Sequence, residues 1–327
     1  MSVPDDRRPR LAYAGATHTG MVREANEDSY VVEPMVFAVA DGMGGHAAGE
    51  VASEIAADRL RSRLKDGAAS VDLMVASVVE ANAAIFQAAH SDSSQRGMGT
   101  TVVALAALVD PAFPTRLVLA NVGDSRAYLF RDGVLKRLSV DHSYVQELVS
   151  TGHITEQEAR THPRRNIVTR ALGIEPTVKV DTWVLPLVRG DRYLLCSDGL
   201  VDEVDDLDIS LILEREADQQ AAADCLIAAA NDNGGHDNTS VIVVDVLEGD
   251  EEPPADFVPT FRKDPVLVDA DAPLQGNPDI IVVPDDVASS GGLRSLFGTR
   301  RRRVLSTLIV VVLLAAIAVG TVLVLGG

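Results

Sequence analysis

The sequence predicts an α+β fold in which antiparallel sheets are covered by helices. Residues 49–64 and 72–90 carry apolar side chains at spacings of three and four, as amphipathic helices do. Three strand-like stretches then follow one another within residues 99–139, and the last contains an Asp132-Gly133 turn typical of a hairpin. Because these strands adjoin in sequence without intervening helices, mainly antiparallel pairing is expected, with the helices packed outside.

The remaining elements are of the same two kinds. Further strands are expected at 11–18, 35–40, 181–187, 192–197 and 239–247, and further helices at about 206–216 and 219–231. A polar, helical insertion at 141–172 separates two groups of strands. These elements place a single folded domain at residues 10–247, after a disordered N-terminus at residues 1–9.

The composition excludes several classes of protein. Hydrophobic residues make up 46% of the chain and charged residues 24%, as in proteins with a packed core. The net charge of -19 argues against nucleic-acid binding, which requires a basic surface. Cys196 and Cys225 form no C-x-x-C pair, so neither a disulfide framework nor a thiolate zinc site is expected. The N-terminal stretch MSVPDDRRPR lacks a following apolar segment and predicts no signal peptide.

The C-terminal quarter predicts a linker and a membrane anchor. Residues 248–303 are acidic and rich in proline, which is typical of an extended linker, and they end in the basic run Arg300–Arg303. Residues 304–325 carry no charge and are long enough to cross a hydrocarbon core of ~30 Å. Arginines next to a span stay on the cytoplasmic side. We therefore expect a single-pass protein of the cell membrane whose folded domain is cytoplasmic.

The stretch VFAVADGMGGHAAG at residues 36–49 allows two interpretations. In the first, Gly42–Ala47 matches G-x-G-x-x-A and cradles the phosphates of a nucleotide. No G-K-[ST] follows, however, and the region about twenty residues on is an expected helix instead of a strand that ends in an acid. In the second interpretation Asp41 carries the chemistry, and the glycines let other groups approach it.

Repetition favours the second interpretation. Asp41, Asp124 and Asp198 each follow an apolar strand, and Asp237 directly precedes another. Aspartate is a poor strand residue and is costly to bury, and carboxylates that meet at the edge of a sheet repel one another unless cations bind them. All-oxygen ligand sets of this kind suit magnesium or manganese. Arg23, beside such a site, is the residue expected to bind a phosphate group.

Seven motifs, in order along residues 10–247, resemble those of the bacterial metal-dependent protein phosphatases, the type 2C serine/threonine phosphatases. They are RxxNED at 23–28, DGMGGHAAGE at 41–50, GMGTT at 97–101, VGDSRAYLFRDG at 122–133, DHS at 141–143, LLCSDGL at 194–200 and DNTS at 237–240. The linker and tail resemble the membrane-anchored actinobacterial form. The resemblance implies a four-layer αββα sandwich, with two antiparallel sheets between helices and metal ions at one end.

The resemblance also implies a site with two or three Mn(II) or Mg(II) ions. Asp41 would bridge two ions, and Gly42 would offer its main-chain carbonyl. The remaining ligands would be Asp198 and Asp237 on the first ion, Glu27 through a water molecule, and Asp124, with Asp198, on a third ion. Arg23 would bind the substrate phosphate. Phosphorylated proteins, including membrane Ser/Thr kinases, would be the substrates and partners, the bilayer would hold the C-terminal helix, and no nucleic acid would bind.

Two histidines and the insertion have less defined roles. In other branches of the family the general acid is a histidine directly after the Asp-Gly pair, whereas three residues here separate Gly42 from His46. His46 is therefore either the acid or a structural residue at a helix start, and His142 is interpreted as orienting its loop. The 141–172 insertion matches the flap of bacterial members, with Arg164 and Arg165 exposed, and either gates substrate entry or is only a solvated helical insert.

Two other functions remain as alternatives. A relative of this kind could dephosphorylate an anti-sigma antagonist, although such relatives usually carry sensor domains and none is visible in the sequence. The chain could also be a catalytically silent membrane scaffold. The complete set of carboxylates argues against a scaffold, because a pseudo-enzyme is expected to have lost a metal ligand.

Overall fold

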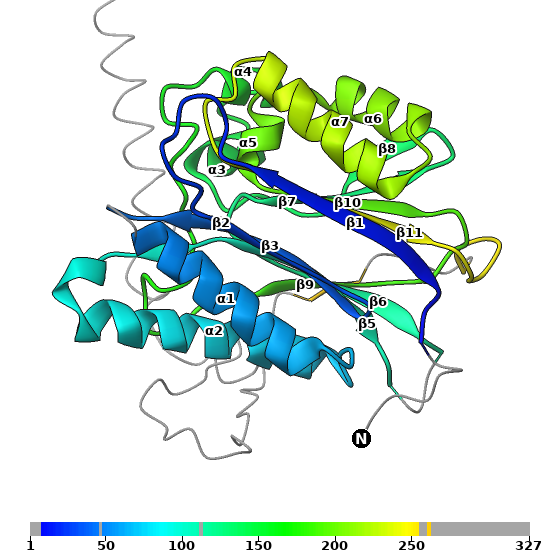
Figure 1. Cartoon of the computed structure of the whole chain (residues 1–327), viewed down its shortest axis with the longest axis horizontal. Coiled ribbons are helices and arrows are strands. Elements are labelled where there is room, and N and C mark those ends of the chain that lie inside the picture. Colours follow the sequence, from blue (N-terminus) through cyan, green and yellow to red (C-terminus); the bar gives the residue numbers. More distant parts are fainter. Residues whose placement is uncertain (1–7, 46–47, 111–113, 255–259, 263–327) are drawn as a thin grey trace, which may run out of the picture. The chain divides into compact units, whose positions relative to one another are not determined.

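Two antiparallel sheets form the centre of the computed structural model, which describes residues 8–45, 48–110, 114–254 and 260–262 (Figure 1). The five-stranded sheet has the order β1 (Leu11–His18), β11 (Thr239–Val246), β10 (Arg192–Cys196), β7 (Arg126–Arg131) and β8 (Val134–Arg137). The seven-stranded sheet has the order β12 (Thr260–Arg262), β9 (Asp181–Leu185), β6 (Arg116–Val122), β5 (Val102–Leu108), β3 (Val36–Met43) and β2 (Asp28–Glu33), with β4 (Gly99–Thr100) paired to β3.

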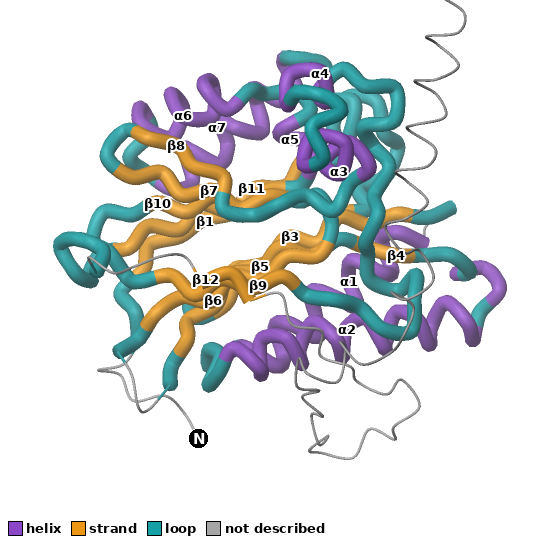
Figure 2. Tube along the Cα trace, turned by 180° about the vertical axis from the view of Figure 1, so that it is seen from behind, coloured by secondary structure: helices purple, strands orange, loops and turns teal. Residues whose placement is uncertain are grey.

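Helices cover the outer faces of the two sheets, so the described part of the domain has four layers (Figures 1 and 2). Helices α1 (Ala48–Leu64) and α2 (Val71–Ser91) pack on the seven-stranded sheet, and α5 (Asp198–Val201), α6 (Asp206–Arg215) and α7 (Gln219–Asp232) pack on the five-stranded sheet. The short helices α3 (Tyr144–Ser150) and α4 (Glu156–Arg160) belong to the insertion, and a 3-10 turn η2 (Ser93–Gln95) follows α2. This arrangement confirms the predicted αββα sandwich.

Successive side chains of the central strands point alternately to the two faces of a sheet, and they contribute to three apolar cores on and between the sheets. In β5, Val103 and Leu105 face the other sheet, whereas Val102 and Ala104 face the helices. Successive side chains of a strand point to opposite faces, so a strand buried on both sides must be apolar throughout. Strand β5 is buried at every position, which explains its unbroken apolar sequence VVALAAL.

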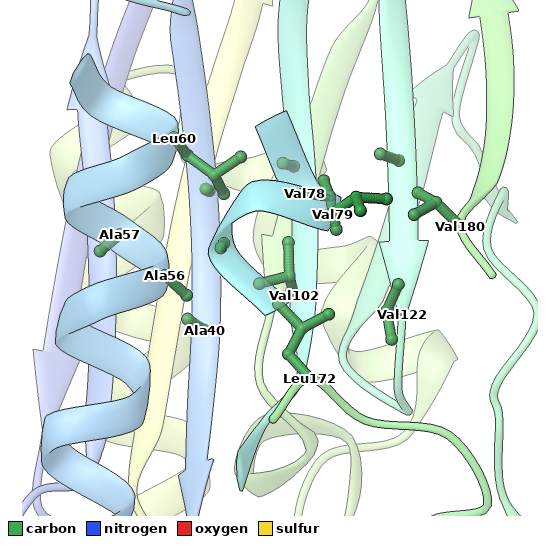
Figure 3. Packing of buried hydrophobic residues seen from close by; sticks show 14 of the residues in the cluster. Ala40, Ala56, Ala57, Leu60, Val78, Val79, Val102, Val122, Leu172 and Val180 are labelled. Atoms are coloured by element: carbon green, nitrogen blue, oxygen red, sulfur yellow. The ribbon is translucent and has the colours of Figure 1, made fainter. Parts of the chain in front are cut away.

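The core beneath α1 and α2 is made mainly of small and branched side chains. Figure 3 shows Leu60 of α1 and Val78 of α2 in one cluster with Val102 and Val122 of the sheet. The start of α2 is fixed by Ser70, whose hydroxyl accepts a hydrogen bond of 3.1 Å from the Leu73 N–H. A serine at this position satisfies an otherwise unpaired donor of the first helical turn.

The predicted hairpin is confirmed by its backbone. Asp132 has a φ of 51° and Gly133 a φ of 75°, and these two residues join the antiparallel strands β7 and β8. Two consecutive positive φ values are those of a type I′ turn, whose twist matches that of the flanking strands. Asparagine, aspartate and glycine tolerate this conformation best, so the sequence identified the turn correctly.

The structure adds four elements that the sequence analysis did not predict, and the 3-10 turn η2 is one of them. Strand β2 and the single-turn helix α5 both lie directly beside the predicted metal residues. Strand β12 pairs with β9 through Thr260–Arg262, although these residues were assigned to the linker at 248–303. The linker at 248–303 stays a prediction, with this three-residue strand inside its bounds.

Within the described residues one helix, α2, is long and apolar enough to cross a membrane, and half of it is buried in the protein. Its side chains Met74, Val78 and Ile85 belong to the core under the seven-stranded sheet, which identifies α2 as a core helix. The predicted transmembrane segment at 304–325 lies outside the described residues and stays a prediction.

Candidate metal centre

The strand directions bring the four predicted aspartates to one end of the sandwich. Strands β3 and β6 are both antiparallel to β5, so they run in the same direction and end at the same edge. Asp41 lies at the end of β3, and Asp124 follows β6. Strands β10 and β11 are antiparallel neighbours, which places Asp198, after β10, beside Asp237, before β11.

Asp41 is held by its neighbours along the seven-stranded sheet. Its N–H donates to Thr101 Oγ1 at 3.1 Å, and its carbonyl accepts from Thr101 N at 2.9 Å and from Thr100 Oγ1 at 2.8 Å. In the register of β2 and β3, Asp41 lies opposite Asp28. The GMGTT motif therefore fixes the backbone from which the Asp41 carboxyl group projects.

Asp28 connects the two sheets at this end. Its Oδ2 accepts a hydrogen bond of 2.9 Å from Ser197 Oγ, and Ser197 Oγ in turn accepts one of 2.9 Å from Ser240 N in β11. The other oxygen, Asp28 Oδ1, is buried without a hydrogen-bond partner in the described structure. Burial raises the pKa of Asp28 to about 6, against the lowering effect of the serine hydroxyl groups.

Asp41 and Asp198 are half-buried, and their carboxyl groups lie close enough to influence each other's pKa. Removal from water raises the pKa of both residues well above the ordinary value, and the charge of a neighbouring aspartate raises each further: Asp198 acts on Asp41, and Asp124 acts on Asp198. Carboxyl groups whose pKa is raised in this way retain protons more readily when no cation is present. A divalent cation can replace such protons and bind both groups.

Close backbone packing explains the glycine after Asp41. A Cβ on Gly42 would lie 2.2 Å from the carbonyl oxygen of Gly49 and 2.4 Å from that of Glu27, so no side chain fits there. The Gly42 N–H donates to the Glu27 carbonyl at 3.2 Å, and a Cβ on Gly49, at the start of α1, would lie 2.8 Å from Glu27 Oε1. Glu27, Gly42 and Asp41 are thus packed into one loop system.

Asn238 fixes the loop that carries Arg23. Its side-chain amide donates to the carbonyl groups of Thr19 at 2.8 Å and Ala25 at 2.9 Å, and its Oδ1 accepts from Glu27 N at 2.8 Å. Arg23 is half exposed and forms a hydrogen-bonded ion pair of 2.6 Å, through Nη2, with Asp237 Oδ2. The predicted phosphate-binding arginine and a predicted metal ligand therefore lie side by side.

Asp124 lies where the sheet meets the insertion. It is buried, and burial together with the charge of Asp141 raises its pKa to about 7. A pocket of about 500 Å³ separates the insertion from α5. Asp124, Asp198 and Asp202 contribute to its lining together with Arg165, which forms an ion pair of 3.4 Å with Asp202. Arg164 and Arg165 are both exposed, as predicted.

The sequence analysis missed three residues of this region. Asp28 stood within a quoted motif without a role, although its position opposite Asp41 makes it part of the cluster. Asp202 follows Asp198 by four residues, a helical spacing that puts both on one side of the α5 turn. Asn238 was recognisable only as the neighbour of Asp237. His46, the candidate general acid, lies outside the described residues.

The residues present fit a binuclear site for hard cations. In the described part of the chain, no three His, Cys, Asp or Glu side chains stand at metal-binding geometry. Asp237 forms its ion pair with Arg23. The unpartnered buried oxygen of Asp28, the raised pKa values and the all-oxygen donor set indicate a cluster that is incomplete without cations.

Comparison with known proteins relates the chain to protein phosphatases. A family model for protein phosphatase 2C matches residues 23–227. The serine/threonine phosphatase stp of Listeria monocytogenes is 42% identical over 241 residues, which are 70% of this chain and 93% of that protein. The serine/threonine protein phosphatase PstP of Mycobacterium tuberculosis is 39% identical over 286 residues, which are 85% of this chain and 51% of PstP.

Solved structures share the fold. The crystal structure of the Mycobacterium tuberculosis phosphatase PstP/Ppp matches with a TM-score of 0.67 and 40% identity over 73% of this chain and 99% of that one. The phosphatase MsPP of Mycobacterium smegmatis, in complex with cacodylate, gives a TM-score of 0.66 and 38% identity over 72% and 98%. A structure of the PstP catalytic domain with two manganese ions gives 0.65 and 38% over 73% and 99%.

Fold and site together define a metal-dependent phosphatase. The family match and the identities show that the chain belongs to the protein phosphatase 2C family, within its bacterial serine/threonine-specific group. The resemblance predicted from the motifs is confirmed.

We expect the metal-free protein to lose stability as the pH rises. Folding raises the pKa of Asp124 from 3.8 to about 7, so the folded state holds this proton more tightly than the unfolded chain. Its stabilising contribution is therefore complete below about pH 4 and is lost as the pH approaches 7. With chelator present, Asp124→Asn should raise the free energy of unfolding at pH 8 by about 1 kcal/mol or more.

Urea unfolding at pH 5 and pH 8 measures this difference. Asp132→Asn, in the exposed hairpin turn, is the matched control, because it makes the same chemical change in a residue that water already solvates. Equal pH dependence of stability in the wild type and Asp124→Asn would contradict the burial argument.

Proposed function

We propose that the chain is a membrane-tethered protein phosphatase that hydrolyses phosphoserine and phosphothreonine with two or three Mn(II) or Mg(II) ions. The observation that carries this proposal is the cluster of buried and half-buried carboxyl groups near the ends of β3 and β10, with Arg23 beside it. Asp41, Asp198 and Asp237 would hold the first ions together with the Gly42 carbonyl. Glu27 would bind through water, and Asp124 would serve a third ion.

Bound ions of this kind lower the pKa of water toward neutrality and stabilise negative charge on phosphoryl oxygens. The protein's own residues then have separate tasks. Asp41 and Asp198 would serve as ionised ligands of these ions. Arg23, which pairs with Asp237 through Nη2, would bind the substrate phosphate, to which its guanidinium can donate two hydrogen bonds.

The leaving serine or threonine oxygen requires a proton. His46 is the proposed donor, because it follows the metal loop by a few residues in the sequence. No protein nucleophile is needed, since an activated water molecule can attack phosphorus directly. Buried Cys196 is unsuited to nucleophilic attack, because burial raises the pKa of its thiol to about 12.

The tether rests on residues 304–325 and the preceding run Arg300–Arg303. An uncharged segment of this length inserts into a bilayer, and the arginines keep the phosphatase domain cytoplasmic. Membrane attachment would confine the enzyme to the plane occupied by membrane Ser/Thr kinases. We propose these kinases and their phosphorylated targets as its substrates.

The insertion at 141–172 is proposed to contact phosphopeptide substrates. Its helices α3 and α4 bury no residue. Its exposed Arg165 lines the pocket that also contains Asp124 and Asp198, and the neighbouring Arg164 is exposed as well. Basic side chains at the rim of an acidic pocket attract a phosphorylated chain. The insertion would therefore favour peptide substrates over small phosphate esters.

Asp41→Asn tests the metal assignment. Loss of the bridging charge should reduce manganese-dependent hydrolysis of p-nitrophenyl phosphate below about 1% of wild type, while circular dichroism shows an intact fold. Asp58→Asn, on the exposed face of α1, makes the same change away from the site and should keep full activity. Retained activity in Asp41→Asn would defeat the metal assignment.

Truncation at residue 303 tests the tether. The full chain should sediment with membranes and resist extraction by carbonate, whereas the truncated chain should remain in the supernatant with unchanged activity on p-nitrophenyl phosphate. A full chain that is released by carbonate, or a truncated chain that stays bound to membranes, would argue against an anchor at 304–325.

Removal of Arg164 and Arg165 together tests the role of the insertion. Replacement by alanine should lower kcat/KM for a phosphothreonine peptide about tenfold, the equivalent of one lost charge-assisted contact of ~1.4 kcal/mol. Hydrolysis of p-nitrophenyl phosphate should change little, because this substrate is too small to reach the insertion. Equal losses on both substrates would show that the two arginines make no specific peptide contact.

A further inference from the structure

His142 contacts both polar groups of a single glycine beside the metal cluster. Its ring Nδ1 accepts a hydrogen bond of 2.9 Å from the Gly123 N–H. The backbone N–H of His142 donates another, also of 2.9 Å, to the Gly123 carbonyl. The His142 side chain is buried. Gly123 directly precedes Asp124 in the chain, so the contact lies one residue from a proposed metal ligand.

The partners of the ring determine where its proton resides. A backbone N–H can only donate, so Nδ1 must carry a lone pair and the single ring proton lies on Nε2. Nε2 faces Asp181 Oδ2 at 3.1 Å, at the start of β9. Arg170 Nη1 also lies 2.7 Å from Nε2. Because Nε2 carries the ring proton, it has no lone pair to accept a hydrogen bond from Arg170, which donates instead to Asp181 Oδ1 at 2.9 Å.

Gly123 adopts a backbone conformation that needs such support. Its φ of +111° is one that residues with a side chain rarely adopt, and a Cβ there would lie 2.5 Å from Thr101 Cβ. The Asn121 side-chain amide donates to the same carbonyl at 3.2 Å. Among these contacts, only His142 Nδ1 holds the N–H side of Gly123, and with it the peptide plane that enters the Asp124 turn.

We propose that His142 is a positioning residue whose Nδ1 acceptor fixes the Gly123 peptide and thereby aims the Asp124 carboxylate at the third cation. This inference rests on the proposed role of Asp124 as a ligand. This positioning role differs from orienting the loop that contains His142, because the decisive contact is to Gly123, which directly follows β6. A group that orients a ligand in this way typically changes metal affinity by about 10- to 100-fold when it is removed.

Two conservative variants separate the two sides of the ring. Asparagine places its side-chain oxygen near the position of Nδ1, so His142→Asn keeps an acceptor for Gly123 and loses the bond to Asp181. Glutamine reaches the position of Nε2, so His142→Gln keeps a partner for Asp181 and loses the acceptor for Gly123. Asp181→Asn is the matched control, because it weakens the hydrogen bond at Nε2 and leaves the contact between Nδ1 and Gly123 in place.

The experiment is a Mn(II) titration of the metal-depleted full chain by calorimetry, with the melting temperature in chelator as a measure of folding. Asp124→Asn defines the signal of the third site. We expect His142→Gln to weaken that signal about 10- to 100-fold, and His142→Asn and Asp181→Asn to stay within about threefold of wild type.

The outcomes distinguish a failure of the positioning role of His142 from a failure of the ligand role of Asp124. If Asp124→Asn leaves the titration unchanged, the ligand role of Asp124 fails. If Asp124→Asn removes a site but His142→Gln does not weaken it, or if His142→Asn weakens it equally, the positioning role is overturned. A collapse of the melting temperature in His142→Gln or in both variants would assign His142 to stability, and would also overturn the positioning role.

Discussion

The structure depends on one electrostatic constraint, which is that several carboxyl groups are removed from water at the same end of the sandwich. Burial and mutual repulsion raise the pKa values of Asp28, Asp41, Asp124 and Asp198 together. Such a cluster opposes folding at neutral pH when no cation is present. The three apolar cores on and between the sheets must offset this cost, and the unbroken apolar sequences of the central strands supply them.

Much of the fold could be predicted because its signals are local. Strand β1 has the predicted bounds, and α1, α2, α6 and α7 agree with the prediction to within one residue at each end. Strand β2 was missed because Asp28–Glu33 is half-buried and carries charged residues at both ends, so it lacks an apolar run. Strand β12 is three residues long within a proline-rich stretch, and only its pairing with β9 identifies it.

The candidate site could be predicted in part for a similar reason. Each aspartate that ends a strand is visible in the sequence, and the convergence of strand ends follows from antiparallel pairing. Asn238 could not be found in this way, and His142 was interpreted only as orienting its own loop. Their importance lies in hydrogen bonds to Thr19, Ala25 and Gly123, partners 19 to 219 residues away along the chain. Only the folded chain brings these groups together.

The bond between Asp28 and Ser197 has a mechanical consequence. Asp28 belongs to the seven-stranded sheet, whereas Ser197 directly follows β10 of the other sheet, so a hydrogen bond of 2.9 Å joins the two layers. Two sheets in contact through apolar side chains could slide past each other at little directional cost, because hydrophobic contact has no preferred direction. The Asp28–Ser197 hydrogen bond does have a preferred direction. It therefore resists sliding of one sheet over the other, at the end of the sandwich where a shift of about 1 Å would disturb catalytic geometry most.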